Sequence, residues 1–176
     1  MWKAEPIHLP DRLAQRFDPE ISARLVGVGN RVLLDRPLIG LLTSRECPGH
    51  VLLSTLDRIP EWVQSGWVIL SGFHAPLEQQ VMRSVLRRQG SVVKVLARGL
   101  DTYRPLPLEH EPLESGRMLI LTAAAPTARR TTRGSALERN RLVLKLATER
   151  VIPYLATSSG LAALLLENDI GTKPTS

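Results

Sequence analysis

Short runs of aliphatic residues alternate along this chain with segments of helical periodicity. The aliphatic runs occupy residues 25–28, 38–42, 67–70, 92–96, 118–121 and 151–155. The run at 38–42 is apolar without a break, which is typical of a strand that is buried on both faces. The segment from Pro76 to Arg88 places Leu77, Val81 and Val85 on one helical face. The alternation predicts an α/β fold with a mostly parallel sheet of about five to six strands and helices on both faces.

Local signals refine this pattern in its second half. Three prolines between residues 103 and 112 predict a loop. Ser135 followed by Glu138 fits a capping box and predicts that a helix begins there. Pro153 places the last strand at an edge of the sheet, which a homodimer could cover. The sequence around Gly160 predicts a final short helix.

Composition and charge favour an anionic partner. The chain has 176 residues, a net charge of +6 and a pI of about 10.2, and only four of its 23 basic residues are lysines. Guanidinium groups bind phosphate oxygens in pairs. Cys47 is the only cysteine, so no internal disulfide can form. With no signal peptide and no membrane-spanning run, we expect a cytoplasmic protein without a membrane partner.

Residues suited to anion binding follow the predicted strands. Ligands of parallel α/β sheets bind beyond the carboxyl ends of the strands, and an arginine-rich segment precedes the helix expected at Ser135. Small residues there allow backbone N–H groups to approach a phosphate, and Phe73 is placed to stack on a base. The candidate binding residues are Ser44, Arg45, Ser71, Gly72, Phe73, His74, Arg129, Arg130, Arg133, Arg139, Asn140, Arg141, Ser159 and Gly160.

Several enzyme classes lack their motifs in this sequence. There is no GxGxxG or GxxxxGK[ST] motif for a classical dinucleotide or P-loop site, and no GxSxG elbow surrounds Ser71. The four histidines have no metal-ligand spacing. We therefore predict no catalytic residue, metal or cofactor. Lys94 lies within a strand, from which it could reach solvent at a sheet edge or point toward the ligand.

Taken in order, these segments resemble the DNA-processing protein A family, which binds single-stranded DNA. The motifs that carry the resemblance are Val-Gly-Val-Gly-Asn at 26–30, Thr-Ser-Arg at 43–45, Ser-Gly-Phe at 71–73, Gly-Leu-Asp at 99–101 and Arg-Asn-Arg at 139–141. The resemblance covers residues 25–166. It implies a Rossmann-like three-layer sandwich over residues 25–171, with an N-terminal extension at 1–24 and a flexible tail at 172–176.

The chain also departs from the family pattern. Ala75 and Glu138 stand where the family has arginines, and we expect neither a sixth parallel strand nor a winged helix after Gly171. These departures weaken the expectation of a recombinase partner.

Our leading hypothesis is a non-catalytic protein that binds single-stranded DNA in DNA processing, uptake or recombination. In this hypothesis Arg45, Arg139 and Arg141 hold phosphates. Backbone N–H groups of Ser44, Gly72 and Gly160 line the pocket. Two alternatives stay open: a nucleotide-binding or nucleotide-processing protein related to the phosphoribohydrolases, and an assembly subunit without a ligand.

Overall fold

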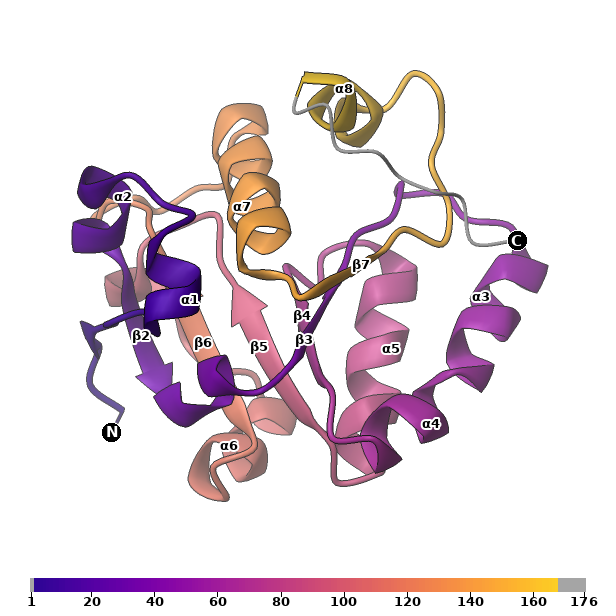
Figure 1. Ribbon diagram of the computed structural model, residues 1–176, viewed down its shortest axis with the longest axis horizontal. Coiled ribbons are helices and arrows are strands. Elements are labelled where there is room, and N and C mark those ends of the chain that lie inside the picture. Colours follow the sequence, from indigo (N-terminus) through magenta and orange to yellow (C-terminus); the bar gives the residue numbers. More distant parts are fainter. Residues whose placement is uncertain (1, 168–176) are drawn as a thin grey trace.

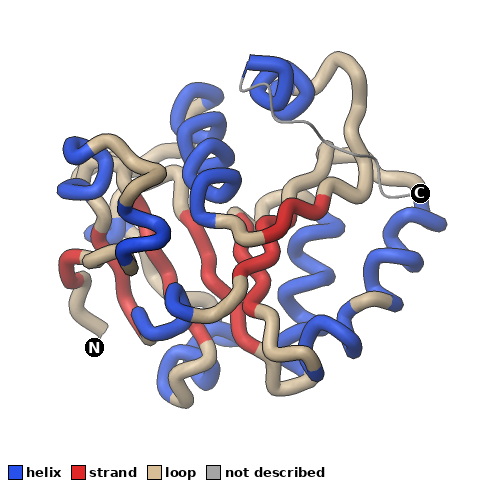
Figure 2. The backbone as a smooth tube through the Cα atoms, in the orientation of Figure 1, coloured by secondary structure: helices blue, strands red, loops and turns tan. Residues whose placement is uncertain are grey.

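The computed structural model, which describes residues 2–167, is built around one seven-stranded sheet (Figures 1 and 2). The strand order is β1-β2-β6-β5-β4-β3-β7. The strands are β1 (Glu5–Pro6), β2 (Val26–Gly29), β3 (Leu38–Leu41), β4 (Val68–Ser71), β5 (Ser91–Val95), β6 (Met118–Thr122) and β7 (Glu149–Val151). Within this order the five strands β6, β5, β4, β3 and β7 are parallel to one another. By contrast, β2 pairs antiparallel to β6, and β1 pairs antiparallel to β2.

The predicted α/β class and mostly parallel sheet are confirmed. Every residue of β3, β4, β5 and β6 is buried, which explains their largely apolar sequences. The sheet has seven strands rather than five or six. The additional strand, β1, has only two residues, Glu5 and Pro6, and both are exposed. Such a strand leaves no hydrophobic signature in the sequence.

Helices cover both faces of the sheet and complete three layers (Figure 1). One face packs against α1 (Asp11–Ala14), α2 (Pro19–Arg24), α7 (Arg133–Leu146) and α8 (Gly160–Glu167). The other packs against α3 (Gly49–Asp57), α4 (Ile59–Gln64), α5 (Pro76–Arg87) and α6 (Pro107–Glu114). Two short 3-10 helices, η1 (Arg31–Asp35) and η2 (Leu100–Thr102), connect strands to neighbouring elements.

The prediction of a loop between residues 103 and 112 is wrong, because α6 begins within this segment. Pro107 occupies the first turn, where a helix needs no N–H donor from that residue. A buried ion pair anchors the helix: the fully buried Glu109 carboxylate lies 2.5 Å from Lys94 Nζ, and it accepts a hydrogen bond from the Tyr103 hydroxyl at 2.5 Å. Lys94 therefore reaches neither a sheet edge nor the ligand-binding end.

The start of α7 and the position of the last strand also differ from expectation. Thr132 caps the helix, because its Oγ1 accepts from Ser135 N at 3.0 Å while Ser135 Oγ accepts from Thr132 N at 2.9 Å. The helix thus begins at Arg133, and Glu138 plays no part in the cap. The last strand lies at residues 149–151 instead of 151–155, although it is an edge strand as predicted.

The N-terminal extension packs as part of the same core. Ile7, Leu13 and Phe17 are buried in the cluster that contains the β3 and β6 side chains and α7. The expected tail at 172–176 and the last residues of the predicted domain, 168–171, lie outside the described part of the chain. Within residues 2–167, every helix is too short or too polar to span a lipid bilayer.

Candidate nucleic-acid interface

Three of the predicted binding residues converge where β3 and β4 end. Arg45 follows β3, His74 follows β4, and Arg139 reaches the same place from α7. The Arg139 guanidinium lies directly on Gly72, where a Cβ atom would stand 2.6 Å from Arg139 Nε. Burial lowers the pKa of His74, and the neighbouring charges of Arg139 and Arg45 lower it further. The three side chains therefore share one electrostatic environment, which we call the cationic cluster.

The turn after β4 is held in a strained conformation. Phe73 has a φ of 50°, which is rare for a residue with a bulky side chain. Ser71 Oγ accepts from Phe73 N at 3.1 Å and stabilises this turn. Strain of this kind persists where the surrounding structure imposes it, often at functional sites. Here it brings the backbone of Gly72 beneath Arg139.

The same turn removes Phe73 and Ser71 from any direct contact with a ligand. The Phe73 ring is 4% exposed and packs into the core between the sheet and α5, so it cannot stack on a base as predicted. Ser71 is fully buried, and its hydroxyl serves the turn. Sequence position places both residues at the correct strand end, but the backbone conformation directs their side chains inward.

Glu78, which is not among the binding residues predicted from the sequence, lies beneath the cationic cluster. Its carboxylate is 4% exposed and accepts hydrogen bonds from Thr43 N at 3.1 Å, His74 N at 3.1 Å and Ala75 N at 3.4 Å. Burial raises the pKa of Glu78, while the three N–H groups and Arg139 oppose this increase. The sequence does contain a signal for this role: Glu78 stands three residues after Ala75, at the start of a helix that begins with Pro76, which is the position of the glutamate in a capping box.

Ser44 has a structural role instead of the predicted phosphate contact. Its backbone N–H donates to Tyr154 O at 3.0 Å, so this group is not free for a ligand. Its hydroxyl accepts from Ala156 N at 2.8 Å and lies 3.3 Å from Ser159 Oγ. Ser159 in turn accepts from Ala162 N at 3.1 Å and caps α8. These contacts join the turn after β3 to the segment that follows β7, leaving Gly160 exposed at the start of α8.

Arg141 and Asn140 also differ from the predicted arrangement. Arg141 forms ion pairs with Glu138 and with Glu167, the latter at 2.9 Å, and so links α7 to α8. Its positive charge is therefore balanced by two carboxylates. Asn140 Oδ1 accepts from both Nε and Nη2 of Arg139 at 3.2 Å and orients that guanidinium toward the cluster.

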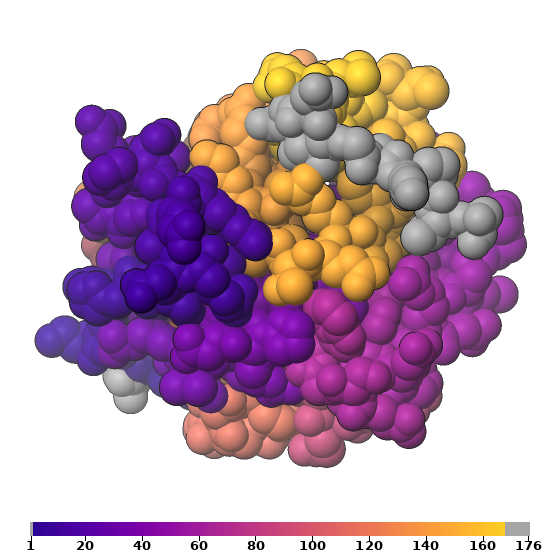
Figure 3. Space-filling view, in the orientation of Figure 1, coloured from indigo at the N-terminus to yellow at the C-terminus, as the bar shows by residue number. Residues whose placement is uncertain are grey.

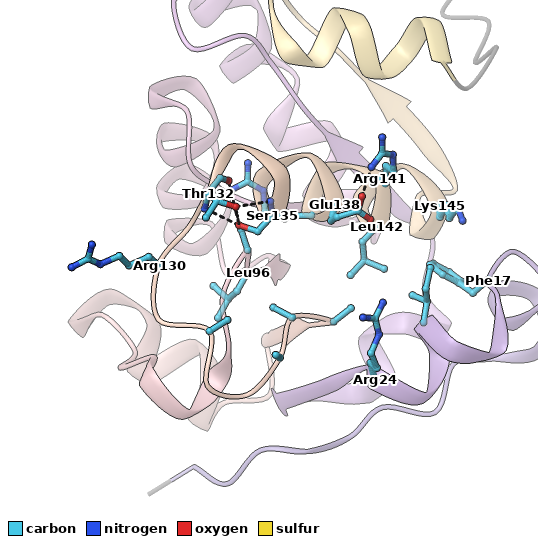
Figure 4. A pocket seen from close by; sticks show the side chains of 17 residues that line it. Phe17, Arg24, Leu96, Arg130, Thr132, Ser135, Glu138, Arg141, Leu142 and Lys145 are labelled. Atoms are coloured by element: carbon cyan, nitrogen blue, oxygen red, sulfur yellow. Dashed lines mark hydrogen bonds and ion pairs between the residues drawn. The ribbon is translucent and has the colours of Figure 1, made fainter.

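The remaining predicted arginines, Arg129, Arg130 and Arg133, are exposed around the start of α7. Like Arg45, they form no hydrogen bond through their side chains and no ion pair with the residues that the structure describes. Figure 4 shows Arg130 directed away from the cavity beneath α7. These side chains are free to attract a polyanion before it reaches the cationic cluster.

A cavity of about 380 Å³ lies beneath α7, next to Arg139 (Figure 4). Its walls are largely apolar and include Leu96, Leu142 and Phe17. Arg24 of α2, which is not among the binding residues predicted from the sequence, faces α7 across the cavity. Within the described residues, no three His, Cys, Asp or Glu side chains gather where they could hold a metal ion.

One known protein family matches most of this chain. The family model of DNA recombination-mediator protein A matches residues 8–165. The chain belongs to this family. No curated protein matches the sequence significantly. The family match includes α1 and α2, in accordance with their place in the core.

Two solved structures of this family share the fold. DNA processing protein A from Helicobacter pylori, described for its single-stranded DNA binding mode, has a TM-score of 0.75 at 23% sequence identity; the match covers 96% of this chain and 78% of that one. DNA processing protein A from Streptococcus pneumoniae has a TM-score of 0.67 at 19% identity, covering 95% and 60% respectively. At these identities the likeness establishes the Rossmann-like fold.

Proposed function

We propose that this member of the DNA recombination-mediator protein A family binds single-stranded DNA without catalysing a reaction on it. The observation that carries the proposal is the cationic cluster of Arg45, His74 and Arg139. Arg45 is exposed and unpaired among the described residues, and Arg139 is oriented by Asn140. Two guanidinium groups at one rim suit successive phosphates of a nucleic-acid strand.

The surroundings of the cluster support a single strand as the ligand. Arg129, Arg130 and Arg133 add positive charge from the adjacent segment, which increases the rate of encounter with a polyanion. The described relative from Helicobacter pylori binds single-stranded DNA.

Fluorescence anisotropy with a labelled oligothymidine tests this function. We expect the wild-type protein to bind the oligonucleotide, and Arg45→Gln to bind it at least about tenfold more weakly, since a charge-assisted phosphate contact is lost. Arg83→Gln is the matched control, because Arg83 is exposed on α5 and has no partner among the described side chains. Equal affinity of Arg45→Gln and wild type would contradict the proposed site.

The cavity beneath α7 favours a second candidate, binding of a free nucleotide. Its volume of about 380 Å³ lies within the range of small-molecule sites, and Arg24 and Arg139 are available for a phosphate. Nucleoside monophosphates should then compete with oligothymidine and raise the melting temperature. Release of free base during incubation would indicate a nucleotide-processing enzyme instead.

We further propose that the protein is cytoplasmic and forms a homodimer. Among the residues that the structure describes, the edge strand β7 pairs only with β3, which leaves its other side for a second subunit. Light scattering of the purified protein, with and without oligothymidine, measures the number of subunits. A monomer under both conditions would contradict the dimer. A recombinase partner stays a weaker expectation, to be tested by co-purification.

A further inference from the structure

We propose that Glu78 is a positioning residue of the nucleic-acid site: its buried carboxylate fixes both turns and Arg139 in the arrangement that binds phosphate. The proposal rests on the proposed function and extends it to an acidic residue. An acid near a polyanion site would ordinarily weaken binding by repulsion. The contacts of Glu78 indicate the opposite effect.

The two carboxylate oxygens of Glu78 serve two separate turns. Oε1 accepts from His74 N and Ala75 N, at the start of its own helix, as a capping residue does. Oε2 accepts from Thr43 N, 35 residues away in sequence, in the turn that leads to Arg45. One side chain therefore sets the spacing between the segments that carry Arg45 and His74.

Glu78 also interacts electrostatically with Arg139, although the two side chains form no direct ion pair. Burial lowers the pKa of Arg139, and the negative charge of the Glu78 carboxylate opposes part of this decrease. A guanidinium that is partly removed from water needs such a partner to stay in place. Arg139 donates from Nε and Nη2 to Asn140, while Nη1 has no hydrogen-bond partner in the described part of the protein. That free group is the one available for a phosphate.

A buried carboxylate is a costly way to hold two turns together. All three of its donors are neutral N–H groups, and Thr43, His74 and Ala75 keep their acceptors only while both carboxylate oxygens are present. A glutamine side chain has almost the same volume. Its amide nitrogen, however, is a hydrogen-bond donor and would face a backbone N–H group, which is also a donor. One of the two turns would then lose its acceptor, and Arg139 would lose its counter-charge.

Oligothymidine titration of Glu78→Gln separates positioning from repulsion by the sign of the effect. Positioning predicts that affinity falls about tenfold, the effect of losing one oriented charged contact. It also predicts that the dependence of log affinity on log salt falls by about 0.7, the value for one phosphate contact with a single strand. Glu61→Gln is the control, because Glu61 is exposed in the first turn of α4 and its substitution changes the net charge of the protein by the same amount as Glu78→Gln.

Glu78→Asp keeps the charge on a shorter side chain and provides a second measurement if Glu78→Gln does not fold. We expect its affinity to lie between those of wild type and Glu78→Gln. Binding by either variant as tight as wild type, or tighter, would overturn the inference. Because that result requires a wild-type protein that binds oligothymidine, it differs from failure of the proposed function, in which the wild type itself does not bind.

Discussion

Two neighbouring arginines of α7 have different surroundings and should contribute differently to binding. Arg139 lies over Gly72 with one guanidinium nitrogen free, whereas Arg141 is paired with Glu138 and Glu167. We therefore expect Arg139→Gln to weaken oligothymidine binding about tenfold and Arg141→Gln to change it little. Anisotropy titration of both variants checks this, and a larger loss for Arg141→Gln would show that the ion pairs open when DNA binds.

Gly72 is small because Arg139 lies against it. A Cβ atom at this position would stand 2.6 Å from Arg139 Nε, so Gly72→Ala should displace the guanidinium and weaken oligothymidine binding. Gly49→Ala is the matched control, since a Cβ there has no other atom within 4 Å. Unchanged binding by Gly72→Ala, in a variant with wild-type circular dichroism, would mean that Arg139 does not contact the strand.

His74 makes binding dependent on pH. Burial, Arg139 and Arg45 lower its pKa from 6.5, so it is neutral in the free protein at neutral pH. A bound phosphate stabilises the imidazolium and raises that pKa, so affinity should be constant well above pH 6.5 and increase as the pH falls below it. Titrations of wild type and His74→Gln between about pH 8 and pH 5.5 test the effect, which should be absent from the variant.

At the residue scale, sequence position predicted which strand ends carry the site, but it did not predict side-chain direction. Arg45, His74 and Arg139 do meet, since their segments follow adjacent parallel strands or cross them. Phe73 was misassigned because its positive φ, which turns the ring into the core, has no signal in the residue type. Glu78 was missed because a residue among apolar positions of a helix gives no indication of a partner 35 residues away.

At the scale of elements, α6 depends on a buried charge pair. Glu109→Gln leaves Lys94 buried without a counter-charge, so we expect the free energy of unfolding to fall by about 3–5 kcal/mol. Urea denaturation measures the loss, with Glu114→Gln, an exposed position on the same helix, as control. A loss below about 1 kcal/mol, the usual value for a surface ion pair, would contradict this role.

Helices and strands were predictable where the chain has a continuous hydrophobic pattern, and less so elsewhere. The strands β3, β4, β5 and β6 and the helix α5 lie within a residue or two of the expected positions. The helix α6 was missed because its prolines were taken for breakers, while Pro107 is in fact at a helix start. Its stabilising contact, between Lys94 and Glu109, is a tertiary interaction that no local pattern contains.

At the scale of the whole molecule, the parallel sheet concentrates positive charge at one end. The carboxyl ends of β3 and β4 carry Arg45 and His74, and α7 adds Arg139. The net charge of +6 indicated an anionic partner, but the sequence could not show which cations are neutralised. The charge of Arg141 is balanced by two carboxylates, whereas no carboxylate among the described residues forms an ion pair with Arg45. This difference depends on how α7, α8 and the sheet pack together.

The salt dependence of oligothymidine binding tests the central claim most directly, because it counts phosphate contacts. The slope of log affinity against log salt should be about 0.7 per contact, so Arg45→Gln combined with Arg139→Gln should lower the wild-type slope by about 1.4. The Arg83→Gln control should leave the slope unchanged. A wild-type affinity independent of salt, or an equal slope in the double variant, would contradict binding of single-stranded DNA at the cationic cluster.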